Sequence, residues 1–256
     1  FIDRRTDFAR CGGNGTINNA AYAEENYNDV TTIGGRMALK IDLNDTWTVT
    51  PTLMGQRETT HGNFSYDPTL GDLKIARYRP ESSKDRWYQA ALAVEGKIGS
   101  LDFIYAGSYM KRDVDTRSDY SDYSFFYDSL FGYGSYWYDD LGDPIDPTQY
   151  IQGADRYTKE SHEFRLSTPS DRPVRVVGGL FFQTQTHGIH QRYMIDGLGS
   201  QIEVTGWPDT LWLTEQFRTD KDRAIFGEIA WDFLPSWTIT AGVRAFVVPR
   251  HLPNGQ

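Results

Sequence analysis

Segment 118–150 is the part of the sequence richest in side chains suited to ligand binding. It reads SDYSDYSFFYDSLFGYGSYWYDDLGDPIDPTQY and holds eleven aromatic residues and seven aspartates, without lysine or arginine. Tyr and Trp rings bury a large rigid area at low entropic cost and keep a polar tip. The aspartates set a negative potential that attracts cationic or metal-bearing ligands. The segment is therefore either a ligand-capturing surface or a loop that packs its aromatic rings on itself and on neighbouring loops. The candidate ligand-binding residues are Tyr133, Tyr136, Trp137, Tyr138, Asp139, Asp140 and Asp143.

Two further patterns bear on metal binding. The aspartates between residues 139 and 146 offer hard oxygen ligands of the kind that Ca²⁺ takes, but they lack the EF-hand spacing. His187 and His190 could share a metal ion, although two solvated loop histidines explain them more simply. No Ser-His-Asp or paired-carboxylate arrangement stands out. We therefore expect no enzyme and no resident cofactor or metal, with calcium at 139–146 as the minor alternative.

Composition excludes several classes of protein. The 256 residues carry 26 basic and 35 acidic side chains, a net charge of −9, whereas nucleic-acid binders are basic. The single cysteine, Cys11, excludes a disulfide framework and a multi-cysteine zinc site. No run of eighteen apolar residues is present to form a transmembrane helix. The 16 tyrosines and 24 glycines suit a chain of many strands and polar loops, including a membrane β-barrel.

Apolar and polar residues alternate with period two in eight segments, which is the pattern of half-buried strands. In TIGGRMALKIDLN, for example, Met37, Leu39 and Ile41 fall on one face and Arg36 and Lys40 on the other. Four pairs of segments are joined by short turns and read as hairpins. The eight predicted strands are 32–44, 46–58, 86–95, 101–109, 160–167, 174–186, 223–233 and 237–248.

The distribution of charge favours a transmembrane barrel over a soluble sheet. Over the cores of the eight segments the apolar faces carry no Asp, Glu, Lys or Arg, and about ten residues per strand suffice to cross a hydrocarbon layer at a tilt. We expect Leu39, Leu92 and Val243 to face lipid. The residues expected to face the lumen are Arg36, Lys40, Glu163, Arg165, Glu228 and Arg244.

The connections alternate between short and long. The second, fourth and sixth are long and all fall at one end, as in barrels with short periplasmic turns and long extracellular loops. Aromatic side chains lie beside the short turns, where an interfacial girdle is expected. Pro51 lacks a ladder donor and therefore needs a bulge or an unpaired position. The girdle residues are Trp47, Phe103, Trp231, Phe233 and Trp237.

Two hairpins resemble those of TonB-dependent outer-membrane receptors. Residues 160–182, ESHEFRLSTPSDRPVRVVGGLFF, are similar to a hairpin with a Glu-x-Arg-Leu strand and a Gly-Leu-aromatic-aromatic strand. Residues 222–246, DRAIFGEIAWDFLPSWTITAGVRAF, are similar to their Phe-Gly-Glu strand followed by a Thr-x-x-Gly-x-Arg strand. The resemblance implies an all-β fold, an antiparallel transmembrane β-barrel of which about eight strands are present. Such receptors have about 22 strands and an N-terminal plug, so we expect residues 1–256 to be part of one barrel domain, with the plug and the remaining strands outside this chain.

The resemblance also implies a function. Such receptors lie in the outer membrane of Gram-negative bacteria and import a scarce ligand, such as a ferric siderophore, cobalamin or an oligosaccharide. TonB and the proton-motive force drive the plug to rearrange. The implied partners are TonB, the plug, outer-membrane lipid and a small-molecule ligand, with no nucleic acid. Two alternatives stay open: a passive porin, and a soluble all-β glycan-binding or adhesin module.

Overall fold

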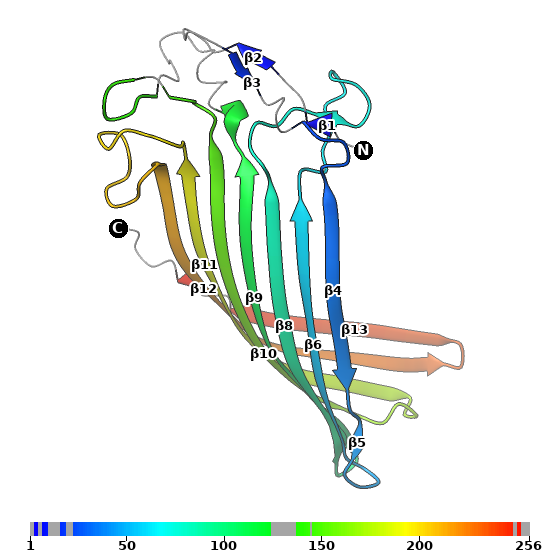
Figure 1. Ribbon diagram of the computed structural model, residues 1–256. Coiled ribbons are helices and arrows are strands. Elements are labelled where there is room, and N and C mark those ends of the chain that lie inside the picture. Colours follow the sequence, from blue (N-terminus) through cyan, green and yellow to red (C-terminus); the bar gives the residue numbers. More distant parts are fainter. Residues whose placement is uncertain are drawn as a thin grey trace.

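The computed structural model describes residues 3–4, 7–9, 16–18, 23–123, 137–143, 145–247 and 250–251, with side chains described for 23–123, 137–143 and 145–247. Most of these residues form one antiparallel sheet of long strands (Figure 1). The predicted Tyr133 and Tyr136 lie outside the described residues. The part of the chain that the structure describes contains no helix long and apolar enough to cross a membrane.

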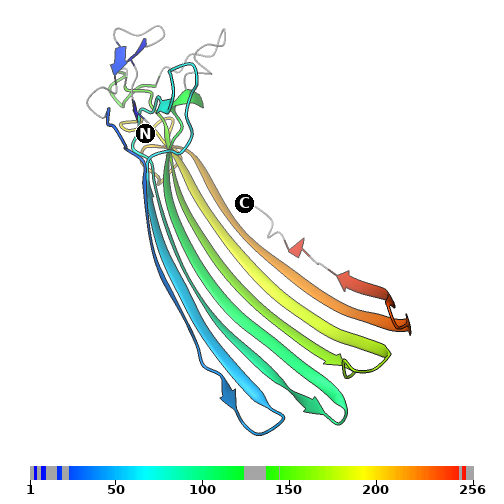
Figure 2. The same cartoon turned by 90° about the vertical axis from the view of Figure 1, so that its right-hand side faces the viewer.

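The main sheet follows the order β13-β12-β11-β10-β9-β8-β6-β4, with each strand antiparallel to its neighbour. Its long strands are β4 (Asp29–Ala38), β6 (Thr48–His61), β8 (Ser82–Ile98), β9 (Leu101–Asp119), β10 (Tyr150–Ser167), β11 (Val174–Met194), β12 (Thr210–Leu234) and β13 (Trp237–Val247). The eight predicted strands and their four hairpins are thus confirmed. Between the described residues of β4 and β13 no pairing closes the sheet, and Figure 2 shows it as an open, curved wall.

Short strands complete the described structure. β5 (Ile41–Asp42) extends β4 along β6, and β14 (Arg250–His251) pairs with β12. β1 (Asp3–Arg4) pairs in parallel with β7 (Lys74–Ile75), while β2 (Asp7–Ala9) pairs with β3 (Thr16–Asn18). The break between β4 and β5 falls opposite Pro51, whose carbonyl still accepts a hydrogen bond from the Leu39 N–H at 3.1 Å. This break is the irregular position that the proline was expected to require.

The strands are longer than the alternation predicted. β9, β10, β11 and β12 contain 19, 18, 21 and 25 residues, against about ten expected for each. Residues 113–119 and 150–157, expected in a loop, are therefore strand, and the long connections shrink to 62–81, 120–149 and 195–209. The prediction of their bounds was wrong because the apolar alternation ends well before the backbone ladder does. All three connections gather at one end of the sheet, opposite the short turns (Figure 1).

The register places the predicted apolar residues together on one face of the sheet. In the β12–β13 hairpin, for example, Ile229 lies opposite Ala241 and Gly227 opposite Val243. These side chains have no layer packed on them: Val243 is 75% exposed and Met37 68% exposed. We call this side of the sheet the apolar face and the opposite side the charged face.

The buried apolar residues gather instead at the end with the long connections. Six of the seven buried hydrophobic side chains lie there, in the connections or at strand ends; they are Ile75, Tyr78, Tyr150, Met194, Ile195 and Leu198. Beside the short turns, aromatic rings meet as predicted, with ring centroids 5.8 Å apart for Trp47 and Phe103 and 6.4 Å apart for Phe233 and Trp237. The sheet thus has a packed cap at one end and an aromatic rim at the other.

Candidate ligand-binding site

A row of aromatic and cationic side chains crosses the charged face near its capped end. Consecutive strands β8 to β12 each contribute one member, and each member is the register partner of the next. The row forms because the same alternation that points apolar side chains to one face points these to the other. We name this set the aromatic-cationic row; its members are Trp87, Arg112, Tyr157, His187 and Arg218.

Tyr157 and His187 form the centre of the row. Their rings stack with centroids 4.0 Å apart and planes 18° apart. His187 Nε2 lies 3.4 Å from Asp155 Oδ1, and the His187 side chain is only 15% exposed. Because the ring is packed on one side and bonded at its edge, its orientation is fixed before any ligand arrives, which lowers the entropic cost of binding.

Arg112 sits beside this stack. Its guanidinium carbon lies 5.9 Å from the Tyr157 ring centroid, and its Nε donates to Asp85 Oδ1 at 2.9 Å and to Oδ2 at 3.0 Å. Asp85 is 18% exposed, whereas Arg112 is 45% exposed, so the half-buried carboxylate holds the Arg112 guanidinium at its Nε side while part of the fork faces solvent. Arg218 forms an ion pair with Asp220, whose Oδ2 lies 2.9 Å from Arg218 Nε, without hydrogen-bond geometry.

The row combines flat aromatic surfaces with guanidinium groups that are held from one side. Guanidinium forks match carboxylate and phosphate oxygens, and aromatic faces receive flat or apolar parts of a ligand. The arrangement is therefore suited to an anionic small molecule with a ring or a chelated centre. The row was not predicted from the sequence, because all its members except Trp87 lie on strand extensions that lack apolar alternation. The sequence signal that could have revealed the row is the alternation of side chains between the two faces, continued beyond the apolar part of each strand.

A second constellation ties the three long connections together. Arg79 Nε donates to Thr148 Oγ1 at 2.8 Å, and Arg79 Nη1 lies 2.5 Å from Asp196 Oδ2. The Tyr150 hydroxyl donates to Asp196 Oδ1 at 2.8 Å, and Arg117 stacks on the Tyr150 ring at 4.4 Å. Burial raises the pKa of Asp196, but the hydrogen bonds from Tyr150 and Arg79 outweigh it, so the pKa lies below its usual value. We call Arg79, Thr148, Tyr150 and Asp196 the loop clamp.

Two of the three aspartates predicted to bind ligand have their carboxylates hydrogen-bonded within the cap. Asp139 Oδ1 accepts from the N–H groups of Leu141 and Asp143, each at 2.9 Å, which closes a tight turn. Asp140 Oδ1 accepts from Ser200 N at 2.7 Å and from Ser200 Oγ at 2.8 Å, and these bonds lower the pKa of Asp140. Segment 137–143 is thereby joined to connection 195–209. The carboxylates of Asp139 and Asp140 thus help to hold the cap together, and a ligand contact by Asp139, Asp140 or Asp143 stays a prediction.

The aromatic members of the prediction differ in exposure. Tyr138 is 38% exposed, and its carbonyl accepts a hydrogen bond from the Gly199 N–H at 2.9 Å. Trp137 is half-buried, and its buried indole N–H has no acceptor within the described part of the chain. Its carbonyl accepts from Ile145 N at 3.0 Å. Both residues belong to the cap, and a ligand contact by either of them stays a prediction.

No group of three or more His, Cys, Asp or Glu side chains comes together to hold a metal ion among the described residues. His187 and His190 lie on opposite faces of β11, because they are three residues apart in one strand. His187 stacks on Tyr157, whereas His190 lies 3.2 Å from Glu215. The two rings do not converge on a shared site.

The residues predicted to face the lumen all lie on the charged face. Glu163 and Arg165 form an ion pair on β10. Arg244 Nη2 lies 3.7 Å from Asp222 Oδ2, and its guanidinium lies 5.2 Å from the Phe181 ring centroid. The register assigns the others to the same side: Arg36 and Lys40 at the β4–β5 edge and Glu228 on β12. They do not meet in one cluster but spread along the height of the sheet.

Comparisons with known proteins identify the fold. No family model and no curated protein matches the sequence. The crystal structure of the ferric citrate transporter FecA, in its unliganded form, is similar with a TM-score of 0.64 and 11% identity, over 89% of this chain and 31% of that one. The ferric yersiniabactin uptake receptor FyuA from Yersinia pestis is similar with a TM-score of 0.60 and 13% identity, over 87% of this chain and 33% of that one.

The chain therefore spans about a third of the length of these two structures. Both are TonB-dependent receptors, so the resemblance inferred from the two hairpins is confirmed at the level of the fold. The open antiparallel sheet described above has the fold of part of the β-barrel of a TonB-dependent receptor.

Proposed function

We propose that this chain is part of a TonB-dependent outer-membrane receptor that imports a scarce small-molecule ligand. In this proposal the apolar face contacts lipid, the charged face lines the lumen, and the three long connections are extracellular. A plug and energy coupling through TonB would be supplied by parts of the protein outside this chain. The fold supports this placement, and the decisive support is the path of one boundary across the sheet.

That boundary is the upper limit of the uncharged stretch on the apolar face. Its first charged residue is Arg57 on β6, Arg86 on β8, Lys111 on β9, Glu160 on β10 and Arg223 on β12. β11 does not mark the boundary, because its apolar face carries no Asp, Glu, Lys or Arg until Arg192 near its upper end. The register row of Arg57 reaches β12 at Phe217, six residues from Arg223. The boundary is therefore oblique: it shifts by about 20 Å along the strands over five strand spacings of about 4.8 Å each.

This slope measures the tilt of the strands relative to the plane that separates apolar from charged residues. A shift of about 20 Å over about 24 Å corresponds to about 40°, within the 35–45° of transmembrane barrels. Ten residues separate Trp47 from Arg57, and ten separate Phe233 from Arg223. That length is about 33 Å along a strand and about 25 Å once tilted, which equals the height of the apolar band of such barrels. A soluble sandwich has no reason to reproduce either value.

The aromatic-cationic row supports an anionic ligand. Arg112 and Arg218 present guanidinium groups on the luminal side, and the Tyr157–His187 stack lies between them in the register. Both structural neighbours are named for ferric chelates. We therefore infer that a negatively charged ferric chelate is the ligand class, ahead of cobalamin and oligosaccharides, which need no cationic row.

The test uses the whole receptor, expressed in a Gram-negative strain that lacks its own ferric citrate uptake. Uptake of ⁵⁵Fe supplied as ferric citrate should require the receptor and should stop when a protonophore collapses the proton-motive force. Arg112→Gln together with Arg218→Gln should reduce uptake at least tenfold, because both cationic contacts are lost. The paired control is Arg36→Gln with Lys159→Gln, which removes two cations from the same face outside the row.

Three results would contradict the proposal. Recovery of the receptor in the soluble fraction would favour a glycan-binding or adhesin module. Uptake that persists with the protonophore would favour a passive porin. Equal losses in the two double variants would remove the aromatic-cationic row as the binding surface.

A further inference from the structure

The charged residues just above the apolar band are mostly cations, although the chain as a whole has a net charge of −9. On β6, β8, β9 and β12 the first charged side chain of the apolar face is Arg57, Arg86, Lys111 and Arg223. Lys221 follows on β12 and points to the same side. Arg57 lies directly opposite Arg86 in the register, an arrangement that is unfavourable without an anion.

Four of these cations are exposed and have no carboxylate within 4 Å among the described residues: Arg57, Lys111, Lys221 and Arg223. Arg86 is the exception, at 3.4 Å from Asp115. We call the four the boundary cations. Because no carboxylate of the described residues holds them, these cations are free to pair with an anion from outside the protein.

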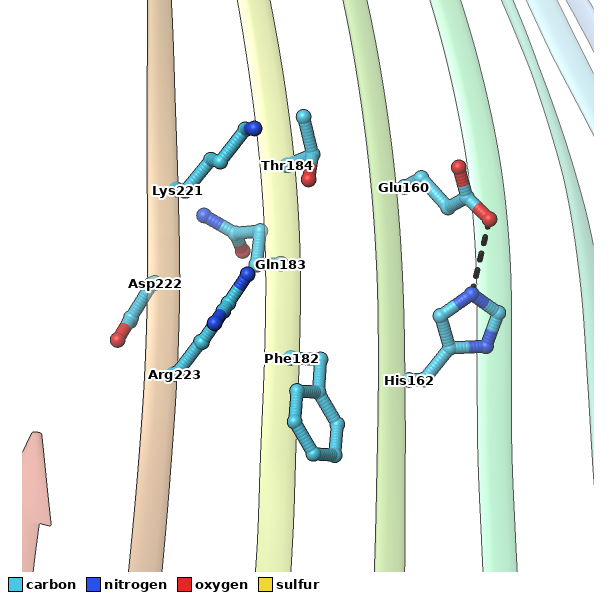
Figure 3. Close-up of a pocket in the computed structure, with 8 residues that line it drawn as sticks. All are labelled: Glu160, His162, Phe182, Gln183, Thr184, Lys221, Asp222 and Arg223. Carbon is cyan, nitrogen blue, oxygen red and sulfur yellow. Dashed lines mark hydrogen bonds and ion pairs between the residues drawn. The ribbon is translucent and has the colours of Figure 1, made fainter. Parts of the chain in front are cut away.

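Lys221 and Arg223 line a pocket on the apolar face, at the top of the apolar band (Figure 3). In Figure 3 both side chains reach from β12 toward β11, where Thr184 adds a hydroxyl and Phe182 lies below. The pocket thus has two positive charges at its upper side and an aromatic ring at its lower side, continuous with Leu180 and Ile225 of the apolar face.

Two carboxylates also line this pocket, and both have partners of their own. Glu160 Oε1 lies 2.9 Å from His162 Nε2, and the dashed line in Figure 3 marks this contact. Asp222 points to the charged face, where its Oδ2 lies 3.7 Å from Arg244 Nη2. Neither forms an ion pair with Lys221 or Arg223 among the described residues, so both cations stay exposed next to an apolar surface.

We propose that the boundary cations bind the phosphate groups of outer-leaflet lipid, with the Lys221–Arg223 pocket as the principal site. The inference rests on the proposed membrane location of the chain. An amphipathic lipid fits the pocket because its phosphate meets Lys221 and Arg223 while its acyl chains extend over Phe182 and the apolar face below. Free phosphate has no use for that apolar side. Cations at this depth gain from anionic headgroups and lose little, because their stems lie on apolar surface.

The test uses the whole receptor, purified in a neutral detergent and shown to be a folded barrel by its heat-dependent shift in gel mobility. Native mass spectrometry then measures the retention of three probes: bisphosphorylated lipid A, the same lipid with both phosphates removed, and inorganic phosphate. Lys221→Gln with Arg223→Gln is compared with Arg36→Gln and Lys159→Gln, which remove the same charge from the luminal side.

We expect the outer double variant, Lys221→Gln with Arg223→Gln, to retain at least tenfold less bisphosphorylated lipid A than the unchanged receptor does. The luminal double variant, Arg36→Gln with Lys159→Gln, should retain it fully. The dephosphorylated lipid should be retained weakly by all three proteins, and inorganic phosphate should not displace the lipid. The proposal would be overturned if the outer variant retained as much bisphosphorylated lipid A as the unchanged receptor, or if the luminal variant lost as much of it as the outer variant. It would also be overturned if the unchanged receptor retained the dephosphorylated lipid as well as the bisphosphorylated one. Displacement by inorganic phosphate would replace the lipid site with a general anion site. A receptor that forms no membrane barrel fails earlier, at the gel-mobility step, and that failure would count against the proposed function.

Discussion

The loop clamp offers a direct way to weaken the cap without touching the long strands of the sheet. Arg79→Ala removes the hydrogen bond to Thr148 Oγ1 at 2.8 Å, the bond from Nη2 to the Thr148 carbonyl at 3.3 Å, and the ion pair with Asp196 at 2.5 Å. Because Thr148 and Asp196 belong to different connections, the substitution removes one contact of 62–81 with each of 120–149 and 195–209. The bonds from Ser200 to Asp140 still join those two connections.

The size of the effect follows from burial. Hydrogen bonds to charged groups contribute about 1.5–3 kcal/mol each when well desolvated. Arg79 is 15% exposed, but Asp196 is 53% exposed, so water replaces much of the lost ion pair. Thr148 is buried, and its hydroxyl and carbonyl lose their partner without gaining water. We therefore expect loop opening to become easier by about 2–3 kcal/mol, a factor of roughly 30 to 150 in the opening equilibrium.

Hydrogen exchange followed by mass spectrometry on the whole receptor measures this factor. Exchange should accelerate in 145–149 and 195–209 and stay unchanged in β8 and β9, whose ladders the substitution leaves intact. Arg79→Lys keeps the charge but loses the fork, so it should give an intermediate rate. Unchanged exchange in the alanine variant would refute the clamp, and a matching acceleration in β8 would show that the substitution acts on the barrel as a whole.

Three further outcomes are expected. Leu39→Arg should destabilise folding into vesicles by about 2–4 kcal/mol in a urea titration, whereas Lys40→Arg should be neutral, and equal effects would invert the assigned faces. Hydrogen bonds from Ser200 lower the pKa of Asp140. They therefore stabilise the cap at pH values above the usual carboxyl pKa, and this stabilisation is lost as the pH falls through the lowered pKa. Proteolysis of the loop should rise only below about pH 4, and the Asp140→Asn variant should show no such rise. Gly179→Val should lower the free energy of unfolding by about 1–3 kcal/mol, because a Cβ there would lie 2.7 Å from the Phe164 carbonyl oxygen and against the Phe226 ring. Adding Phe226→Ala should recover only the part of this loss that comes from the clash with the ring.

The sheet was predictable from sequence because alternation is strongest where one face is apolar. On β12 the pattern is clear from Ile225 to Trp231, and the structure confirms its register and its hairpin with β13. The same strand begins at Thr210, fifteen residues before that pattern starts. Above the apolar band both faces carry polar residues, so hydrophobic periodicity vanishes while the backbone ladder continues. Apolar alternation therefore does not predict where these strands end.

The candidate site was hidden for the same reason. Arg112, Tyr157 and His187 become neighbours only through the β9–β10 and β10–β11 registers, and all three lie on the polar extensions of their strands. Sequence analysis selected an aromatic and acidic loop on composition alone. The roles of Asp139 and Asp140 depend on their partners, and Ser200, which lies 60 residues away, has no sequence signal that marks it as one.

In the proposed barrel, the tilt of the strands also sets the height of the aromatic-cationic row. Trp87 lies one residue from Arg86 at the boundary on β8, whereas Arg218 lies five residues beyond Arg223 on β12. At about 3.3 Å per residue and a tilt of about 40°, the row climbs from the level of the membrane surface at Trp87 to about 13 Å above it at Arg218. Its cationic end thus stands in the mouth of the proposed barrel, on the side where β12 rises highest, and its aromatic end reaches the level of the membrane. If the proposed function holds, a ligand that meets Arg218 first and Trp87 last travels along the row toward the membrane, which is the direction of the proposed import.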